Sequence, residues 1–218
     1  MGKIYQGILG GVSSKVGSVV GAAWKGIPVL RVYQPNVSNP KTAAQEIVRG
    51  GFKMLSNIAS YALAGFIKPV WDRGAVRMSG YNAFISANKE NIKKSASAAF
   101  STLVAGKGKM AATPFTVTKG VGEKAQSIMW EDSTNRYALP TDKAYVLVID
   151  DEGMPVAWGD TGATRQAKNA PLSGLTFNPE SDGTKTVCLY LVFVREDGTI
   201  VSDSSSQVSN DGIEIPSE

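Results

Sequence analysis

The last half of the chain, residues 111–218, alternates short apolar runs with turn residues. Strands are predicted over 115–118, 127–130, 144–149, 156–158, 172–177, 186–195 and 199–202. Asp151-Glu152-Gly153 and Glu196-Asp197-Gly198 stand between such runs, in sequences that favour hairpin turns. About 100 residues of short strands separated by turns are typical of an immunoglobulin-like or fibronectin-like β-sandwich. We therefore expect a sandwich domain over 111–218.

Residues 39–110 follow a helical rather than an alternating pattern. Asn39 before Pro40 predicts a helix start, and an apolar stripe follows at Ile47, Phe52, Leu55, Ile58, Ala59 and Ala62. Gly50-Gly51 weakens this helix, and Ser79 is the expected N-cap of another one. The small residues and lysines of 95–110 predict a connector. Whether the helical and β-rich halves pack together or act as separate beads is left open by the pattern.

Residues 1–38 are rich in glycine and β-forming residues. Residues 18–24 and 27–33 flank Lys25-Gly26, which predicts a β-hairpin, and Pro28 favours an edge strand. Such an arm has too little core to stand alone, so it must pack on the rest of the chain or on a neighbour. The residues expected to make this contact are Lys15, Val19, Trp24, Lys25, Ile27, Arg31 and Tyr33. The predicted fold class is α+β, with an arm (1–38), a basic helical region (39–110) and an acidic sandwich (111–218).

Charge is divided unevenly along the chain. The whole sequence has 23 basic and 19 acidic side chains and a net charge of +4. Residues 1–110 hold 15 basic and three acidic side chains, a net +12, whereas residues 111–218 hold eight and 16, a net −8. Such halves could attract one another between subunits, and head-to-tail contacts of that kind build rings or filaments. The basic half could instead attract DNA or RNA.

Composition argues against catalysis. The chain has no histidine, so it can form neither a Ser-His-Asp triad nor a Cys-His pair. Its single cysteine excludes a disulfide within the chain. The glycine-rich start lacks the Gly-Lys-Ser/Thr of a phosphate-binding loop. Asp150-Asp151-Glu152 is expected to be a solvated turn, and Cys188 a small core residue. We expect no enzyme, no cofactor, no metal, no membrane span and no signal peptide.

Several motifs resemble a known family. The run Gly7–Gly21, the sequence Trp24-Lys25-Gly26-Ile27, Asn39-Pro40-Lys41-Thr42 and Ser79-Gly80-Tyr81-Asn82-Ala83-Phe84 are similar to the signature of a family of short Bacteroidota and phage-associated proteins. That family is classed as a domain of unknown function, and its members end in a β-rich half. The resemblance covers essentially the whole chain and implies no activity. By analogy, the arm and linker also look like those of phage structural proteins.

The leading hypothesis is a non-enzymatic structural protein of a phage particle, in its tail, neck or capsid decoration. It would be made in the cytoplasm of the host bacterium and reside in the virion. Its expected partners are further copies of itself or other virion proteins, reached through the arm. The alternative is a protein that binds DNA or RNA through its basic half. A third possibility is an adhesin whose sandwich holds glycans.

Overall fold

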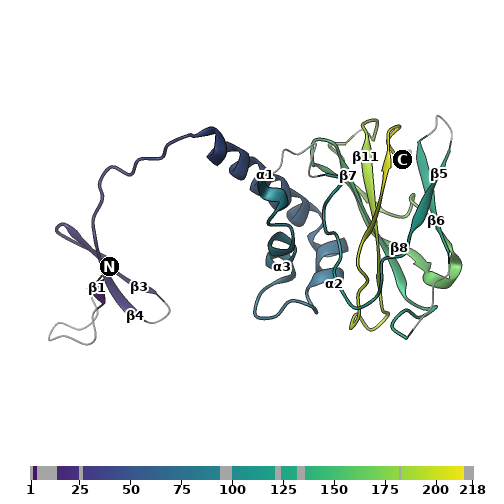
Figure 1. Cartoon of the computed structure of the whole chain (residues 1–218), viewed down its shortest axis with the longest axis horizontal. Helices are drawn as coiled ribbons and strands as arrows, with labels where there is room; N and C mark the ends of the chain where they lie inside the picture. Colours follow the sequence, from purple (N-terminus) through teal and green to yellow (C-terminus); the bar gives the residue numbers. More distant parts are fainter. Residues whose placement is uncertain are drawn as a thin grey trace. The chain divides into compact units, whose positions relative to one another are not determined.

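The computed structural model describes residues 2–3, 14–24, 27–93, 100–120, 124–131, 136–181 and 183–213. The chain divides into two compact units, Met1–Lys41 and Thr42–Glu218. The fold is a mixed α+β one, in which three α-helices accompany three antiparallel sheets in the described ranges (Figure 1). No helix of these ranges is long and apolar enough to cross a membrane.

The N-terminal unit is a four-stranded sheet in the order β1-β4-β3-β2. Its strands are β1 (Gly2–Lys3), β2 (Ser14–Val16), β3 (Val19–Trp24) and β4 (Ile27–Val32). The ladder between β3 and β4 runs from Val19↔Val32 to Trp24↔Ile27, as a hairpin requires, and the predicted turn at Lys25-Gly26 lies outside the described residues. The prediction of an edge strand at Pro28 is wrong, because β4 lies between β1 and β3. Within the described residues, β1 pairs with Leu30 and Val29 of β4.

The second unit begins with helix α1 (Ala43–Tyr61). Thr42, rather than the predicted Asn39, is the N-cap: its hydroxyl accepts the backbone N–H of Gln45 at 3.4 Å. The chain therefore enters the helix three residues later than expected. Gly50-Gly51 does not interrupt α1, and Gly51 is buried within it, because packing of the helix outweighs the low helix propensity of glycine.

Two shorter helices follow. A π-helical turn (Leu63–Ile67) leads into α2 (Lys68–Trp71), which carries Pro69 in its first turn. Helix α3 (Gly80–Ala87) has the predicted N-cap, since the Ser79 hydroxyl accepts the N–H of Asn82 at 3.3 Å. A short 3-10 turn (Asn91–Lys93) comes after it.

The β-rich part forms two antiparallel sheets. Three strands in the order β5-β6-β9 make the smaller sheet, and five in the order β10-β8-β7-β11-β12 make the larger. Their bounds are β5 (Phe115–Lys119), β6 (Ala125–Trp130), β7 (Lys143–Asp150), β8 (Pro155–Thr164), β9 (Asn169–Pro171), β10 (Thr176–Phe177), β11 (Val187–Val194) and β12 (Ser205–Ser209). A 3-10 turn (Arg165–Ala167) joins β8 to β9. The strand predicted over 199–202 is reduced to isolated bridges at Val201 and Ser202, and β12 takes its place in the sheet.

The larger sheet is the middle layer of the unit, with a core on each face. Along β11, Cys188, Tyr190, Val192 and Val194 join the helices in one core. Their neighbours Val187, Leu189, Leu191 and Phe193 join the smaller sheet in the other. Successive side chains of a strand point to opposite faces, so a strand covered on both sides is apolar throughout. The helical and β-rich halves therefore pack together and are not separate beads.

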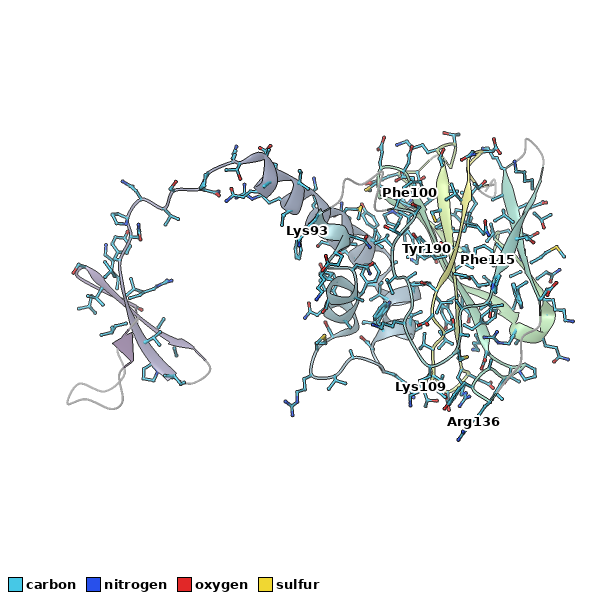
Figure 2. The ribbon with its side chains drawn as sticks, in the orientation of Figure 1. Lys93, Phe100, Lys109, Phe115, Arg136 and Tyr190 are labelled. Carbon is cyan, nitrogen blue, oxygen red and sulfur yellow. The ribbon has the colours of Figure 1, made fainter. Side chains whose placement is uncertain are left out.

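Residues 100–110, the described part of the connector predicted over 95–110, are built into this packing. The Tyr190 hydroxyl donates to the carbonyl of Phe100, and the Trp71 Nε1–H donates to that of Ala105 at 2.9 Å. Figure 2 labels Tyr190 and Phe100. Gly108 lies so close to the backbone of Val201 that a Cβ there would be 1.8 Å from the carbonyl oxygen of Val201. Only glycine permits this approach.

Candidate interaction surface

One face of the N-terminal sheet carries two of the predicted contact residues, on the two strands that flank β3. Lys15 on β2 is paired with Val20 on β3, and Val20 is paired in turn with Arg31 on β4. Cross-strand partners share a face, so the two cations flank an apolar valine. Both cations are exposed. No acidic residue occurs among residues 1–41, which hold five basic side chains.

Tyr33 joins this face through Lys15. The Lys15 Nζ lies 3.7 Å from the centre of the Tyr33 ring, and the Tyr33 N–H donates to the carbonyl of Ser18 at 2.8 Å. A cation over an exposed aromatic ring is worth about 0.5–1 kcal/mol. The contact holds the lysine and the tyrosine together beyond the end of β4.

The other predicted contact residues are placed differently. Ile27 is half-buried and lies on the same face as Arg31, since residues two and four apart in a strand share a face. Val19 lies on the opposite face, beside Val32. Trp24 is in β3, and its side chain is outside the described part of the structure, as is the whole of Lys25.

The sheet has almost no core of its own. Among its described residues only Gly21 and Val29 are buried, while Val16 is 61 % and Val32 80 % exposed. An isolated sheet of this kind is marginal in water unless one face packs on something. The sheet therefore presents apolar and basic groups that a partner surface could cover.

The start of α1 is a second exposed apolar surface. The stripe that is buried at Leu55 and Ile58 continues toward the N-terminus as Ile47, Val48 and Phe52, which are 45–50 % exposed. Ile47 and Phe52 belong to the predicted apolar stripe, and the structure leaves them about half exposed because the beginning of the helix extends past the layer that covers its later turns. The pattern shows which residues share a helix face but not how far the body beneath that face reaches.

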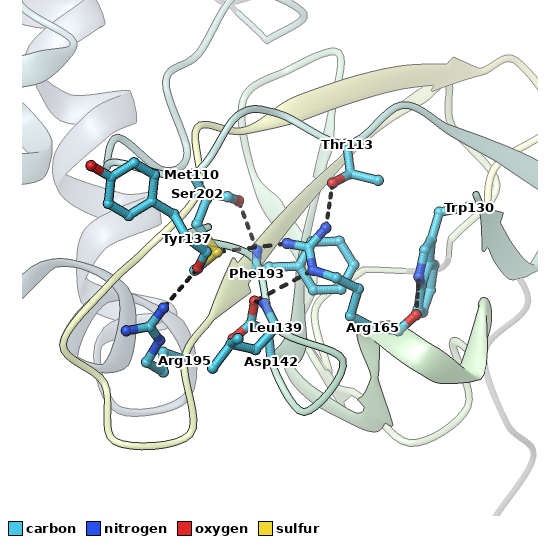
Figure 3. Close-up of polar contacts among 10 residues, drawn as sticks. All are labelled: Met110, Thr113, Trp130, Tyr137, Leu139, Asp142, Arg165, Phe193, Arg195 and Ser202. Atoms are coloured by element: carbon cyan, nitrogen blue, oxygen red, sulfur yellow. Dashed lines mark hydrogen bonds and ion pairs between the residues drawn. The ribbon is translucent and has the colours of Figure 1, made fainter. Parts of the chain in front are cut away.

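A buried charged cluster in the second unit went unpredicted. Arg165 is fully buried, and its Nε donates to Asp142 Oδ2 at 3.4 Å while Nη1 donates to the Thr113 hydroxyl at 2.8 Å (Figure 3). The guanidinium carbon lies 3.8 Å from the centre of the Phe193 ring. Charged residues are rarely buried unless paired, and nothing in the local pattern of the sequence marks this arginine as buried.

No group of three or more acidic or cysteine side chains that could hold a metal ion occurs in the part of the chain that the structure describes. Cys188 is buried, as predicted, and burial raises the pKa of its thiol to about 11. At neutral pH the thiol is therefore protonated, whereas the thiolate is the nucleophilic form.

A family model matches residues 10–207 of the 218-residue chain. The chain belongs to DUF6266, a family of unknown function. The DUF6266 match ends within β12 and takes in parts of both compact units. Neither the curated proteins nor the solved structures gave a match. A resemblance to a family of unknown function is thus confirmed, whereas the Bacteroidota and phage association stays a prediction.

Proposed function

We propose that this DUF6266 protein is a non-enzymatic assembly component, in which the N-terminal sheet of one subunit packs on an adjacent subunit. The observation that carries the proposal is that the N-terminal sheet has almost no core of its own. Exposed Val16 and Val32 lie on one face, and Lys15 and Arg31 lie on the other. Covering such a sheet buries apolar area, and this burial is the main favourable term in most protein association.

Charge favours a neighbouring subunit as the cover. The N-terminal unit has five basic side chains and no acidic one, whereas residues 111–218 carry a net charge of −8. Complementary charges steer two surfaces together and fix their register. A contact between the sheet of one copy and the β-rich part of the next repeats from copy to copy, so it generates a ring or a filament. We propose a phage particle, at its tail, neck or capsid decoration, as the assembly.

We also infer that the two β-sheets form an immunoglobulin-like or fibronectin-like sandwich. The connectivity supports this: β5-β6-β9 corresponds to strands A-B-E, and β8-β7-β11-β12 to C′-C-F-G of that architecture, with β10 as an additional strand beside β8. The shared core of the two sheets lies between them. This fold serves many adhesive and structural proteins, so it accords with assembly but does not decide a function.

Removal of residues 1–41 tests the assembly. Thr42–Glu218 is a compact unit with two cores of its own, so it is expected to fold without the N-terminal sheet. Sedimentation should show oligomers of the full chain and monomers of Thr42–Glu218. The full chain with Val37→Asp, changed at an exposed linker position, is the control and should still assemble. A truncated protein with the same mass distribution as the full chain would refute the proposal.

Binding of DNA or RNA is the second candidate, supported by Lys15 and Arg31, which share one face of the sheet. The basic half alone, residues 1–110, is not a suitable protein for this test, because its helices pack on β-strands of the other half. The full chain and Lys15→Ala/Arg31→Ala should instead be titrated with duplex DNA at several salt concentrations. Binding through phosphates weakens steeply with salt, and loss of two contacts lowers the slope by about two. An identical slope for both proteins would exclude the sheet as the binding surface.

A further inference from the structure

We propose that a basic cleft in the Thr42–Glu218 unit binds an oxyanion, either a carboxylate or a phosphate group. The cleft has a volume of about 390 Å³ and lies between α2 and the adjoining ends of β7 and β11. Lys143 and Val194, which are cross-strand partners at these ends, form one side. Lys68 and Arg73 contribute the other side, from α2 and the turn that follows it.

Four cations line the cleft: Lys68, Arg73, Lys143 and Arg195. None of them forms an ion pair with a carboxylate in the ranges that the structure describes. Cations of like sign repel one another when they converge on a confined space, and an anion between them removes that cost. Their convergence without ion-pair partners is the first argument for a bound anion.

Arg195 supplies the second argument. Its Nη2 donates to the carbonyl of Tyr137 at 2.8 Å, which fixes the guanidinium (Figure 3). Its Nε is buried and finds no hydrogen-bond acceptor among the described residues. That nitrogen is out of reach of a ligand in the cleft, but Arg195 itself lines the cleft. An arginine presents several N–H donors in a fixed fork that matches carboxylate and phosphate oxygens, and the Tyr137 contact holds this fork at the edge of the cleft.

Two of the three acidic residues of the cleft, Asp72 and Asp197, accept hydrogen bonds from nearby residues of the chain. Asp72 Oδ1 accepts the N–H of Gly80 at 2.7 Å, and Asp197 Oδ1 accepts both the N–H and the hydroxyl of Thr199, at 2.8 and 2.6 Å. The Thr199 hydrogen bonds, helped by Arg195 and Arg73, lower the pKa of Asp197. Glu196 is the third carboxylate, so the lining keeps an excess of one positive charge.

Gly198 and Tyr145 also shape the cleft: the glycine leaves space beside Arg73, and the tyrosine offers a hydroxyl donor. Gly198 has a φ of +70°, and a Cβ there would lie 3.2 Å from Arg73 Nε, so a side chain would press on the guanidinium. Tyr145 lines the cleft, and burial, followed by the nearby Asp160, raises the pKa of its hydroxyl. The hydroxyl therefore stays protonated and can donate a hydrogen bond to an anion.

Titration of the full chain with inorganic phosphate and, separately, with acetate tests the site, each against sodium chloride of equal ionic strength. Calorimetry should give saturable binding of at least one of them. Saturation by phosphate alone identifies a phosphate site, and saturation by acetate identifies a site that accepts carboxylates. Absence of saturation by both would overturn the proposal.

Variants assign the binding to the cleft. Arg195→Met and Arg73→Met should each weaken the anion at least tenfold, whereas Lys109→Met, an exposed lysine outside the cleft, should leave affinity unchanged. Arg195→Met also removes the hydrogen bond to the Tyr137 carbonyl, and this loss by itself can impair folding. Arg73→Met does not touch that hydrogen bond, so it tests the cleft separately. Equal affinities in wild type and Arg73→Met would refute the cleft as the site. The outcome is independent of assembly, since the same titration applies to monomeric Thr42–Glu218.

Discussion

The phenol oxygen of Tyr190 accepts the backbone N–H of Leu103 at 3.0 Å and donates its proton to the carbonyl of Phe100. One side chain in the middle of β11 thereby satisfies two backbone groups of a segment that is distant in sequence. That segment, residues 100–110, passes over the face of the larger sheet that the helices also cover. Tyr190 thus joins the helical and β-rich halves into one unit.

Tyr190→Phe should destabilise the second unit by about 1–3 kcal/mol, because the buried N–H of Leu103 and the part-buried carbonyl of Phe100 lose their partner. Urea unfolding of Thr42–Glu218 measures the change as a lower midpoint with an unchanged slope. Tyr61→Phe is the matched control: Tyr61 is 41 % exposed and donates only to Glu180 at the surface, so its loss should cost less than about 0.5 kcal/mol. Equal effects of the two substitutions would contradict the role of Tyr190.

Arg165→Met should destabilise the unit by about 3–5 kcal/mol, because it leaves the buried Asp142 carboxylate without its cation. Asp142 Oδ1 already lacks a hydrogen-bond partner within the described ranges, so the remaining charge is poorly compensated. The double variant Arg165→Met/Asp142→Leu should recover part of the loss. Arg136→Met, at an exposed position, should change stability by less than about 0.5 kcal/mol. If the separate effects of Arg165→Met and Asp142→Leu simply add up in the double variant, Arg165 and Asp142 are not coupled.

Gly108→Ala should destabilise the unit by more than about 3 kcal/mol, because the new Cβ would meet the Val201 carbonyl 1.8 Å away and force the two segments apart. Gly50→Ala is the opposite case. Gly50 lies in α1 with nothing within 4 Å of an added Cβ, so alanine should stabilise the helix by about 0.5–1 kcal/mol. Thermal unfolding of the two variants should therefore shift in opposite directions.

Cys188 should resist thiol reagents in the folded protein, because burial raises its pKa from 9.0 to about 11. In the unfolded chain the thiol ionises first, so stability should fall as the pH rises through this interval. Cys188→Ala should remove that part of the pH dependence. The comparison is made by urea unfolding of both proteins between pH 7 and alkaline pH. Parallel stability curves would contradict the predicted pKa.

Some of the fold is local enough to be predicted from the sequence. Turn residues at Asp151-Glu152-Gly153 and a capping serine at Ser79 act on their immediate neighbours, and both lie where expected. The apolar run of β11 likewise predicts a buried strand, and its single cysteine a core residue. The absence of histidine limits the available chemistry regardless of the fold.

What only the tertiary structure decided depends on residues far apart in the sequence. Burial of Arg165 requires Asp142, Thr113 and Phe193 to converge on it, and the cleft at Arg195 requires α2 to lie beside β7 and β11. The exposed start of α1 depends on where the layer beneath it ends. Periodicity assigns a side chain to a face, whereas the partner of that face is fixed by packing free energy summed over the whole unit. For this reason the sequence determined the long apolar strand β11, the cap at Ser79 and the charge of each half, whereas the tertiary structure alone decided which side chains remain exposed.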